Sequence, residues 1–485
     1  MPAEIKFGTD GWRGVVADDF TYENLRYVSQ GVAEYLNAKG DESLAVIGYD
    51  CRFASEDFAR EVARVLTANG VRCVIFDRPS PTQVASWEVI ARHAAGGVVI
   101  TASHNPWIFN GVKYKPETGS SAPPEVISEL EKRIHALVSR GPGAVKRNEL
   151  PESGRDGRVD TVDPRPSYYE QVGKMLDLDS VRKAGLRILH ECMHGSGYGY
   201  IADLVGGGST RVTELHAERN PYFGGVNPEP IPQNLEQALE AMRKGEHDLC
   251  IATDGDADRV GIIDETGTFI TQLQVYALLM LYLFEMRGWR GPVVKTINMT
   301  SMADELGRQF GVDVYELPVG FKNVAPKMIE TDAVLGGEES GGFGFRGHIP
   351  ERDGILAGLF FADMIVRAGK PLSRILAELE ERVGPHAYAR HDIHLPRESY
   401  ESDRKRILQT LQEKAPRTVA GQAVERVRDD DGVKFYLRDG SWVLLRMSGT
   451  EPLIRVYAEA ENPKAVEDRL AALEDIVGVG GQGGG

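Results

Sequence analysis

The chain has 485 residues, too many for a single hydrophobic core, so we expect several domains. Its 56 Lys and Arg residues against 72 Asp and Glu residues give a formal net charge of −16, and without a basic run a nucleic acid is not an expected partner. The four cysteines form no CxxC pair, and the most apolar helical segment is shorter than the roughly 20 residues of a membrane span, so we expect a cytoplasmic protein without a membrane partner.

Residues 1–150 alternate apolar strands with helices. Such alternation is typical of parallel βαβ units, and we assign these residues to a first α/β domain. A glycine-rich segment, residues 7–14, comes first and would present Arg13 from a flexible backbone. The pattern predicts strands at 44–49, 71–76 and 98–100 and helices at 22–39, 55–69 and 82–92.

Ser103 follows the apolar strand 98–100 in the stretch GVVITASHNP, residues 97–106. A position just beyond the carboxyl end of a central strand is where open α/β sheets bind their ligands. His104 lies beside this serine, and Lys113 lies on what the pattern predicts to be the next strand. Taken alone, the serine could equally belong to an ordinary hydrogen-bonded turn, and the lysine could be a solvated surface residue.

Residues 140–166 are rich in Gly, Pro, Arg and Asp, and we place the first domain boundary there. A second α/β domain is predicted at 167–268 and a third at 269–386. In the second, the pattern predicts strands at 186–190, 211–215 and 249–253 and helices at 195–205 and 234–244. In the third, it predicts helices at 273–286, 302–310 and 355–368 and strands at 293–296 and 313–317.

The strand 249–253 runs into the loop DGDADR, which carries Asp254, Asp256 and Asp258. Three carboxylates at a spacing of two place hard oxygen ligands together, and a cation such as Mg²⁺ relieves their repulsion. An EF-hand is excluded because Arg259 stands where its loop needs glycine and strands flank the loop. An aspartyl-phosphate phosphatase, in which such an aspartate is the nucleophile, stays open, as does a solvated acidic turn.

The last segment, residues 391–477, has a different pattern from the three domains before it. Its pattern predicts a smaller α+β domain with strands at 433–437 and 442–446 and helices at 404–413 and 464–476. Its second strand ends in RMSGTEP, residues 446–452. Arg446 could bind a phosphate bidentately, with two hydroxyls and a glycine N–H around it. A capped turn is the alternative.

In the third domain, residues 337–342 read GEESGG and place an acceptor and a hydroxyl between glycines. This arrangement suits the hydroxyls of a sugar but is a weak signal alone.

Together these four loops resemble those of the α-D-phosphohexomutases, the family of phosphoglucomutases, phosphomannomutases and phosphoglucosamine mutases. TASHNP, DGDADR, GEESGG and RMSGTEP come in the family's order and spacing, and the resemblance extends from Phe7 to about Ala460. It implies three related α/β domains and a TATA-binding-protein-like α+β domain around a central cleft. This agrees with the division into 1–150, 167–268, 269–386 and 391–477.

The resemblance also implies roles for individual residues. Ser103 would carry a phosphoryl group and, with Asp254, Asp256 and Asp258, would bind Mg²⁺. Arg13, Lys113 and His104 are the candidates for proton transfer. The implied substrate-binding residues are Arg259, Gly320, Lys322, Glu338, Ser340, His348, Arg446, Ser448, Gly449, Thr450 and Arg455. One departure leaves the acid and base open: Gly342 stands where some members have a histidine, and a histidine follows later, at His348.

The implied reaction passes the phosphoryl group of the serine to a hexose monophosphate, which gives a 1,6-bisphosphate, and then returns the other phosphate to the enzyme. We expect a phosphoglucomutase, monomeric or homodimeric, with glucose 1,6-bisphosphate as activator. Its Glu-Glu-Ser loop resembles the loops of phosphoglucomutases more than the Glu-Met-Ser or Glu-Gln-Ser forms that we associate with the mannose and glucosamine enzymes. A phosphomannomutase or phosphoglucosamine mutase is the alternative within the family. From other classes, a phosphatase and a non-catalytic sugar-phosphate-binding protein stay open.

Overall fold

The computed structural model describes residues 5–8, 11–40, 43–150, 158–396, 398–414, 416–447 and 452–479. The chain forms two structural units, and each is described by itself. The first comprises Met1–Val294 and Gly320–Ile375, and the second comprises Lys295–Val319 and Leu376–Gly485. In the described ranges, no helix has the length and apolar character that a membrane crossing requires.

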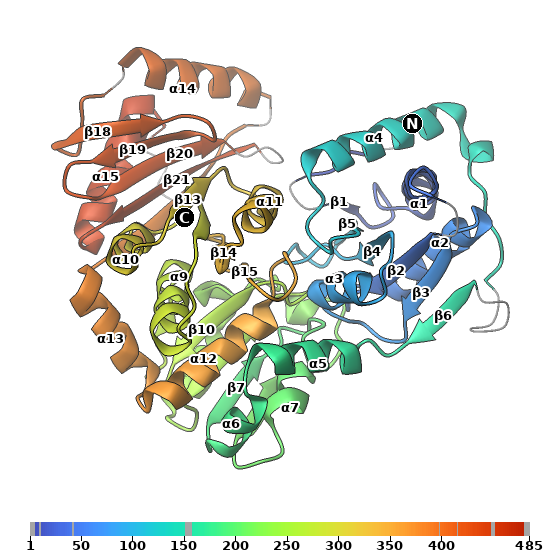
Figure 1. Cartoon of the computed structure of the whole chain (residues 1–485). Coiled ribbons are helices and arrows are strands. Elements are labelled where there is room, and N and C mark those ends of the chain that lie inside the picture. Colours follow the sequence, from blue (N-terminus) through green and yellow to red (C-terminus); the bar gives the residue numbers. More distant parts are fainter. Residues whose placement is uncertain are drawn as a thin grey trace. The chain divides into compact units, whose positions relative to one another are not determined.

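Six strands form the first sheet, in the order β1-β5-β4-β2-β3-β6 (Figure 1). Strands β4, β2, β3 and β6 pair in parallel, whereas β5 pairs antiparallel with both β4 and β1. The sheet is therefore mixed, and β5 returns antiparallel because the loop from β4 to β5 is too short for a crossover. The strands are β1 Trp12–Val15, β2 Leu44–Tyr49, β3 Arg72–Phe76, β4 Gly96–Ile100, β5 Phe109–Pro116 and β6 Val159–Val162.

The centre of this sheet is buried because its strands are apolar and rich in β-branched residues. β2 reads LAVIGY and β4 reads GGVVI, and only the first residue of β2 is partly exposed. Helices pack against these strands. A ligand can therefore contact the ends of the strands but not the faces of the sheet. The helices are α1 Tyr22–Asn37, α2 Ser55–Ala68, α3 Thr82–Ala91 and α4 Pro124–Arg140.

Five strands form the second sheet, in the order β11-β10-β9-β7-β8, with β9, β7 and β8 parallel and β10 antiparallel to both its neighbours. The helix expected at 195–205 begins only at Tyr200. Gly195 instead lies so close to the acidic loop that a Cβ on it would be 2.7 Å from the carbonyl oxygen of Asp254. The strands are β7 Arg187–Glu191, β8 Arg211–Leu215, β9 Leu249–Thr253, β10 Val260–Asp264 and β11 Phe269–Ile270, and the helices are α5 Arg165–Met175, α6 Leu178–Lys183, α7 Tyr200–Val205 and α8 Glu236–Arg243.

The third sheet has the order β13-β12-β14-β15, with β14 and β15 antiparallel. Its apolar helix α9 ends in a π-helical turn over Tyr282–Met286, and Asp353 caps helix α12 by accepting from the N–H of Leu356. The strands are β12 Val293–Thr296, β13 Val314–Leu317, β14 Leu335–Gly337 and β15 Phe343–Phe345. The helices are α9 Gln272–Leu281, α10 Met302–Phe310, α11 Phe321–Thr331, α12 Gly354–Ala368 and α13 Leu372–Val383.

One topological feature recurs in the three sheets. In each, an antiparallel pair of consecutive strands is joined by a loop that carries one of the motifs found in the sequence. The β4–β5 loop carries TASHNP, the β9–β10 loop carries DGDADR, and the β14–β15 loop carries the EESGG part of GEESGG. The three loops therefore occupy equivalent places in three related α/β domains.

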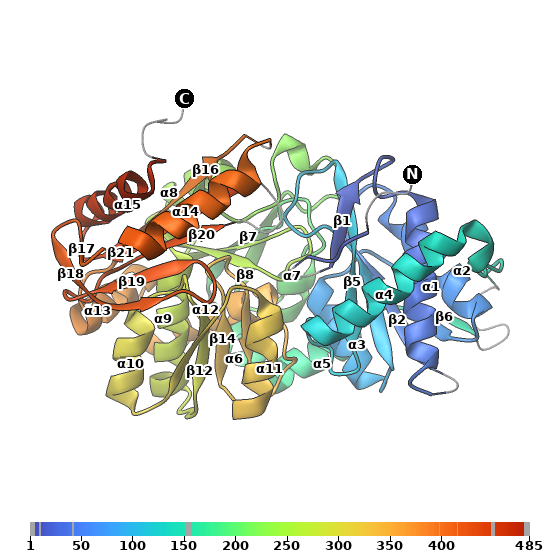
Figure 2. The same ribbon diagram turned by 90° about the horizontal axis from the view of Figure 1, so that it is seen from above.

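In the second unit, a six-stranded sheet with the order β16-β21-β20-β19-β18-β17 is antiparallel throughout. Helices α14 and α15 pack beside it (Figure 2), and their apolar residues form one core with the strands. This is the smaller α+β domain that the sequence predicts. The strands are β16 Ala387–His394, β17 Thr418–Val419, β18 Gln422–Arg428, β19 Val433–Leu437, β20 Trp442–Met447 and β21 Leu453–Ala460, and the helices are α14 Tyr400–Lys414 and α15 Pro463–Val477.

Candidate active site

Ser103 lies in the β4–β5 loop and faces the acidic loop of the second sheet. Its Oγ donates a hydrogen bond to Oδ2 of Asp254 at 2.9 Å, and its backbone N–H donates to Oγ1 of Thr101 at 2.8 Å. Its φ of 52° is in the left-handed region, which non-glycine residues seldom adopt. The structure thus brings together the serine and the aspartates that the sequence singled out separately.

The serine loop is held by Arg52, a fully buried residue that the sequence interpretation missed. Its guanidinium donates to four carbonyl groups of the loop and lies 3.2 Å from Oδ2 of Asp50. The carbonyls belong to Ser103, Asn105, Pro106 and Phe109, at nitrogen–oxygen distances of 2.5, 2.6, 3.0 and 3.0 Å. The sequence could have indicated Arg52 by its position shortly after the end of β2, at the same edge of the sheet as the serine.

The three aspartates of the β9–β10 loop are fully buried, and each offers a carboxylate oxygen within 4.8 Å of the others. Oδ1 of Asp256 and Oδ1 of Asp258 are buried without a hydrogen-bond partner. Buried carboxylate oxygens without a donor are costly, and a hard divalent cation is the ligand that satisfies them. The residues present therefore fit a Mg²⁺ site.

Lys113 projects from β5 into this cluster. Its Nζ lies 2.9 Å from Oδ2 of Asp256 and 2.8 Å from Oδ2 of Asp258, and the side chain is buried rather than solvated. Thr82 also donates to Asp256, at 2.5 Å. Burial alone would raise the pKa of Asp256, but Lys113 and Thr82 hold it well below its usual range. Burial and the two neighbouring carboxylates raise the pKa of Asp254 well above its usual range.

His104 and Arg13 both lie at the serine loop, as expected. Nδ1 of His104 is 3.4 Å from Oγ of Ser103, and Arg13 donates from Nη1 to Oδ1 of Asn105 at 2.5 Å. Burial and the nearby cations, Arg259 foremost, lower the pKa of His104 well below its usual value. The lowered pKa favours the neutral form of the imidazole beside the serine.

Arg259 and the residues of the third sheet extend the cluster. The N–H of Arg259 donates to Oδ1 of Asp254 at 3.1 Å, and its Nη1 lies 3.5 Å from Glu229. Glu338 follows β14, is buried, and accepts on Oε1 from the N–H of Gly320 at 3.0 Å. Two further expected substrate ligands, Ser340 in the same loop and Lys322 in the first turn of α11, are half-buried.

Arg352 lies between the β9–β10 loop and the β14–β15 loop and was not predicted. Its Nη2 lies 3.0 Å from Oδ2 of Asp258, and its Nη1 lies 3.7 Å from Oε2 of Glu338. Gly342 makes room for it, because a Cβ at 342 would lie only 2.3 Å from Cδ of Arg352. The arginine thus passes through space that a histidine at 342 would need.

The structure places His348 in a different network. Its side chain is buried, with Nε2 2.8 Å from Oδ2 of Asp353, and its ring stacks on Trp87. Asp353 also accepts from the hydroxyl of Tyr168 and caps α12. These contacts account for the buried position of His348 without a ligand. Its expected contact with a substrate stays a prediction.

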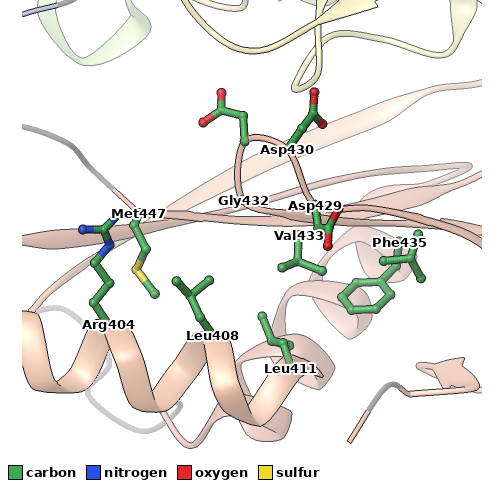
Figure 3. A pocket seen from close by; sticks show the side chains of 11 residues that line it. Arg404, Leu408, Leu411, Asp429, Asp430, Gly432, Val433, Phe435 and Met447 are labelled. Carbon is green, nitrogen blue, oxygen red and sulfur yellow. The ribbon is translucent and has the colours of Figure 1, made fainter. Parts of the chain in front are cut away.

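The motif RMSGTEP, residues 446–452, belongs to the second unit, and three of the phosphate ligands expected in it, Ser448, Gly449 and Thr450, lie outside the described residues. Nε of Arg446 is 2.9 Å from Oδ1 of Asp431, and Arg455 is the cross-strand partner of Arg446. Asp431 also lines a cavity of about 530 Å³. Figure 3 shows Leu408 and Leu411 of α14 on one side of this cavity. A phosphate site at these arginines stays a prediction.

Comparison with known protein families matches four domain models in the order of the chain. Residues 4–140, 166–267 and 272–383 match the alpha/beta/alpha domains I, II and III of phosphoglucomutase/phosphomannomutase. Residues 408–476 match the C-terminal domain of the same family. The matches therefore extend over most of the chain.

Individual relatives match over their whole length. A "Phosphoglucomutase/phosphomannomutase" of Thermococcus kodakarensis is 30% identical, with 96% of each chain covered. A "Probable phosphoglucosamine mutase" of Methanopyrus kandleri is 32% identical over 97% of each chain. Among solved structures, a putative phosphomannomutase from Thermus thermophilus superposes with a TM-score of 0.84 at 34% identity, covering 99% of this chain and 100% of that one.

Proposed function

The chain belongs to the phosphoglucomutase/phosphomannomutase family and is a phosphohexomutase, and from that premise we propose that Ser103 is the residue that carries the transferred phosphoryl group. The observation that supports this role is the 2.9 Å hydrogen bond from its Oγ to Asp254, at the edge of a cluster with unsatisfied carboxylate oxygens. A phosphoryl group on this oxygen would lie beside the cation site. Family membership favours a mutase over the phosphatase and the non-catalytic binding protein.

The proposed step breaks the bond between phosphorus and Oγ of Ser103 and forms one to the free hydroxyl oxygen of a hexose monophosphate. The hydroxyl gives up its proton, and Oγ of Ser103 takes one up as its bond to phosphorus breaks, so that the step is balanced. Reversal after the bisphosphate has turned around returns the other phosphoryl group to Ser103. Asp254, Asp256 and Asp258 would hold a Mg²⁺, which when bound supplies positive charge next to the transferred group.

We assign to His104, rather than to Lys113, the passing of a proton to Oγ of Ser103 as its bond to phosphorus breaks. The neutral imidazole lies 3.4 Å from Oγ of Ser103. Lys113 instead lies between Asp256 and Asp258, where its Nζ contacts and positions both carboxylates. Arg13, which holds Asn105, orients the loop that bears the serine.

The test is the mass of the intact protein before and after incubation with a hexose 1,6-bisphosphate, followed by peptide mapping. We expect one added phosphoryl group on the peptide that contains Ser103. The variant Ser103→Ala should stay folded, since a loop serine contributes little to a core, and should lose nearly all turnover. Phosphate on a peptide containing Asp254, or wild-type turnover by the variant, would overturn the assignment.

The sugar is a separate proposal. Glucose was the expected substrate, but the relatives matched over nearly the whole chain are named for glucosamine, glucose and mannose phosphates, so the names favour the alternative over a dedicated phosphoglucomutase. We therefore propose that glucosamine phosphate is among the substrates. Glu338 and Ser340, in the loop after β14, suit hydroxyls that these sugars share, so discrimination at carbon two should be only ~1–3 kcal/mol.

The preferred sugar is tested by parallel kcat/KM measurements on the 1-phosphates of glucose, mannose and glucosamine. Each reaction is primed with the 1,6-bisphosphate of the same sugar. We expect the value for glucosamine 1-phosphate to lie within about 200-fold of the best of the three, as one misplaced polar group permits. A larger gap would refute the proposed substrate. It would leave the role of Ser103 standing, because the mass measurement tests that role independently.

A further inference from the structure

Three side chains with different metal-binding atoms meet at the ends of the parallel strands β7 and β8. His190 is on β7, Cys192 follows that strand directly, and Glu214 is the cross-strand partner of His190 on β8. His190 and Cys192 are fully buried, and the side chain of Glu214 is 20% exposed. The cluster is separate from the aspartates of the β9–β10 loop and takes no part in the proposed mutase reaction.

The distances in this cluster match those of a zinc site. Nδ1 of His190 lies 3.2 Å from Oε1 of Glu214 and 3.4 Å from Sγ of Cys192, and Sγ lies 3.8 Å from Oε1. A tetrahedral zinc with bonds of about 2.0–2.3 Å to nitrogen, oxygen and sulfur keeps its ligand atoms about 3.4–3.6 Å apart. The three atoms therefore already form a triangle of nearly that size.

The surroundings orient two of these ligands. Nε2 of His190 lies 3.2 Å from Oγ1 of Thr253, so a proton on Nε2 would leave Nδ1 as the metal-binding nitrogen. Metal-bound histidines usually donate their other ring N–H in this way. Oε1 of Glu214 accepts from the N–H of Gly199 at 2.7 Å, which fixes the carboxylate. Glu214, with its side chain 20% exposed, is the member of the cluster that contacts solvent.

We propose that His190, Cys192 and Glu214 form a second cation site, selective for zinc-class metals over Mg²⁺, with a solvent molecule as the fourth ligand. The mixed nitrogen, sulfur and oxygen donors are the basis of that selectivity, since Mg²⁺ takes oxygen ligands. Binding displaces the thiol proton to solvent. The ion ties the ends of β7 and β8 together and, through His190, fixes Thr253, the residue before Asp254.

The test uses the full chain, stripped with a chelator, kept under a non-thiol reductant and supplied with excess Mg²⁺ to occupy the aspartate loop. Co²⁺, a spectroscopic substitute for zinc, is then titrated in. We expect a thiolate-to-cobalt charge-transfer band that saturates at one ion per chain and is displaced by zinc. The absence of this band in the wild-type protein, or a band that excess Mg²⁺ removes, overturns the proposal.

Variants identify the ligands. Cys192→Ser should abolish the band, and Glu214→Gln should keep a weaker band and lower zinc affinity by at least about tenfold. Cys250→Ser is the matched control, because Cys250 is a buried cysteine on the neighbouring strand β9. It should leave the band unchanged. An unchanged band in Cys192→Ser, or equal loss in the Cys250 control, refutes the site; if Cys192→Ser does not fold, the wild-type titration and Glu214→Gln still decide.

Discussion

Arg352 reaches the acidic loop because residue 342 has no side chain. A Cβ at this position would lie 2.3 Å from Cδ and 2.7 Å from Cγ of Arg352, too close for either atom to stay in place. Gly342→Ala should therefore displace the guanidinium from Asp258, which it approaches to 3.0 Å. A misplaced group of this kind costs up to about 100-fold in rate, so we expect kcat to fall roughly 10- to 100-fold.

The control for this variant is Gly143→Ala, since nothing lies within 4 Å of a Cβ at residue 143. It should keep wild-type kcat. Thermal unfolding of both variants separates a local effect from a global one, because overpacking at 342 should cost about 1–3 kcal/mol without abolishing the fold. Wild-type kcat in Gly342→Ala would mean that the position of Arg352 does not matter for turnover.

At the scale of an element, the β4–β5 loop depends on one side chain outside it. The fully buried guanidinium of Arg52 donates to four of its carbonyls, including that of Ser103. Lysine has a single nitrogen and cannot reproduce this arrangement, so Arg52→Lys should let the loop move although the charge beside Asp50 is kept. We expect kcat to fall at least about 100-fold, as for a displacement of roughly 1 Å, with a smaller change in KM.

Hydrogen exchange of the loop amides tests the physical cause of that loss. In Arg52→Lys the amides of residues 101–109 should exchange faster, while those of β2 stay protected. Arg72→Lys is the matched control, because Arg72 lies exposed at the start of β3 in the same sheet. Slow exchange in the loop combined with low kcat would show that Arg52 acts on turnover in some other way.

The buried strands of the core could be predicted well from the sequence. β2, β9 and β12 have the expected bounds, because short apolar runs between turn residues are informative in themselves. Helix α11 was missed because Pro326 lies inside it, which argues against a helix by local rules. The antiparallel direction of β5 could not be predicted because pairing direction depends on where the chain returns, not on the residues of the strand.

Some residues of the candidate site could likewise be predicted from the sequence, and others could not. Ser103 and the three aspartates stand out because their own short motifs carry the chemistry, and the structure brings them together. Arg52 and Arg352 do not stand out, because each acts on groups that are distant in the sequence. An arginine is usually a solvated surface residue, and only the fold shows that these two are buried among carbonyls and carboxylates.

At the scale of the whole molecule, each unit contains a glutamate that is held by cations; the side chain of Glu61 is 1% exposed and that of Glu316 is 13% exposed. In the first unit, Glu61 accepts from Arg26 at 2.6 Å, from Arg147 at 2.7 Å and from Arg64 at 3.1 Å. Burial alone would raise its pKa, but these hydrogen bonds lower it to about 2. The charged carboxylate is therefore favoured by the folded state.

Glu316 plays the same part in the second unit. Nζ of Lys434 lies 2.9 Å and Nζ of Lys295 3.6 Å from its Oε2, and the hydroxyl of Tyr436 donates to Oε1. Against the effect of burial, the two lysines and the tyrosine lower the pKa of Glu316 to about 2. The two glutamates have separate sets of partners, so their contributions to stability should add within about 0.5 kcal/mol.

Acid unfolding should therefore depend on both residues. Their folded pKa of about 2 lies below the ~4.3 of an exposed glutamate, so each stabilises the protein above about pH 4.5 and loses that contribution as the pH falls towards 2. Each contribution amounts to about 1–3 kcal/mol. Glu61→Gln and Glu316→Gln should each make the unfolding free energy fall less steeply with acid, and the double variant should combine both changes. Glu149→Gln, an 80% exposed neighbour of Arg147, should keep the wild-type slope; equal slopes in all variants would contradict the argument.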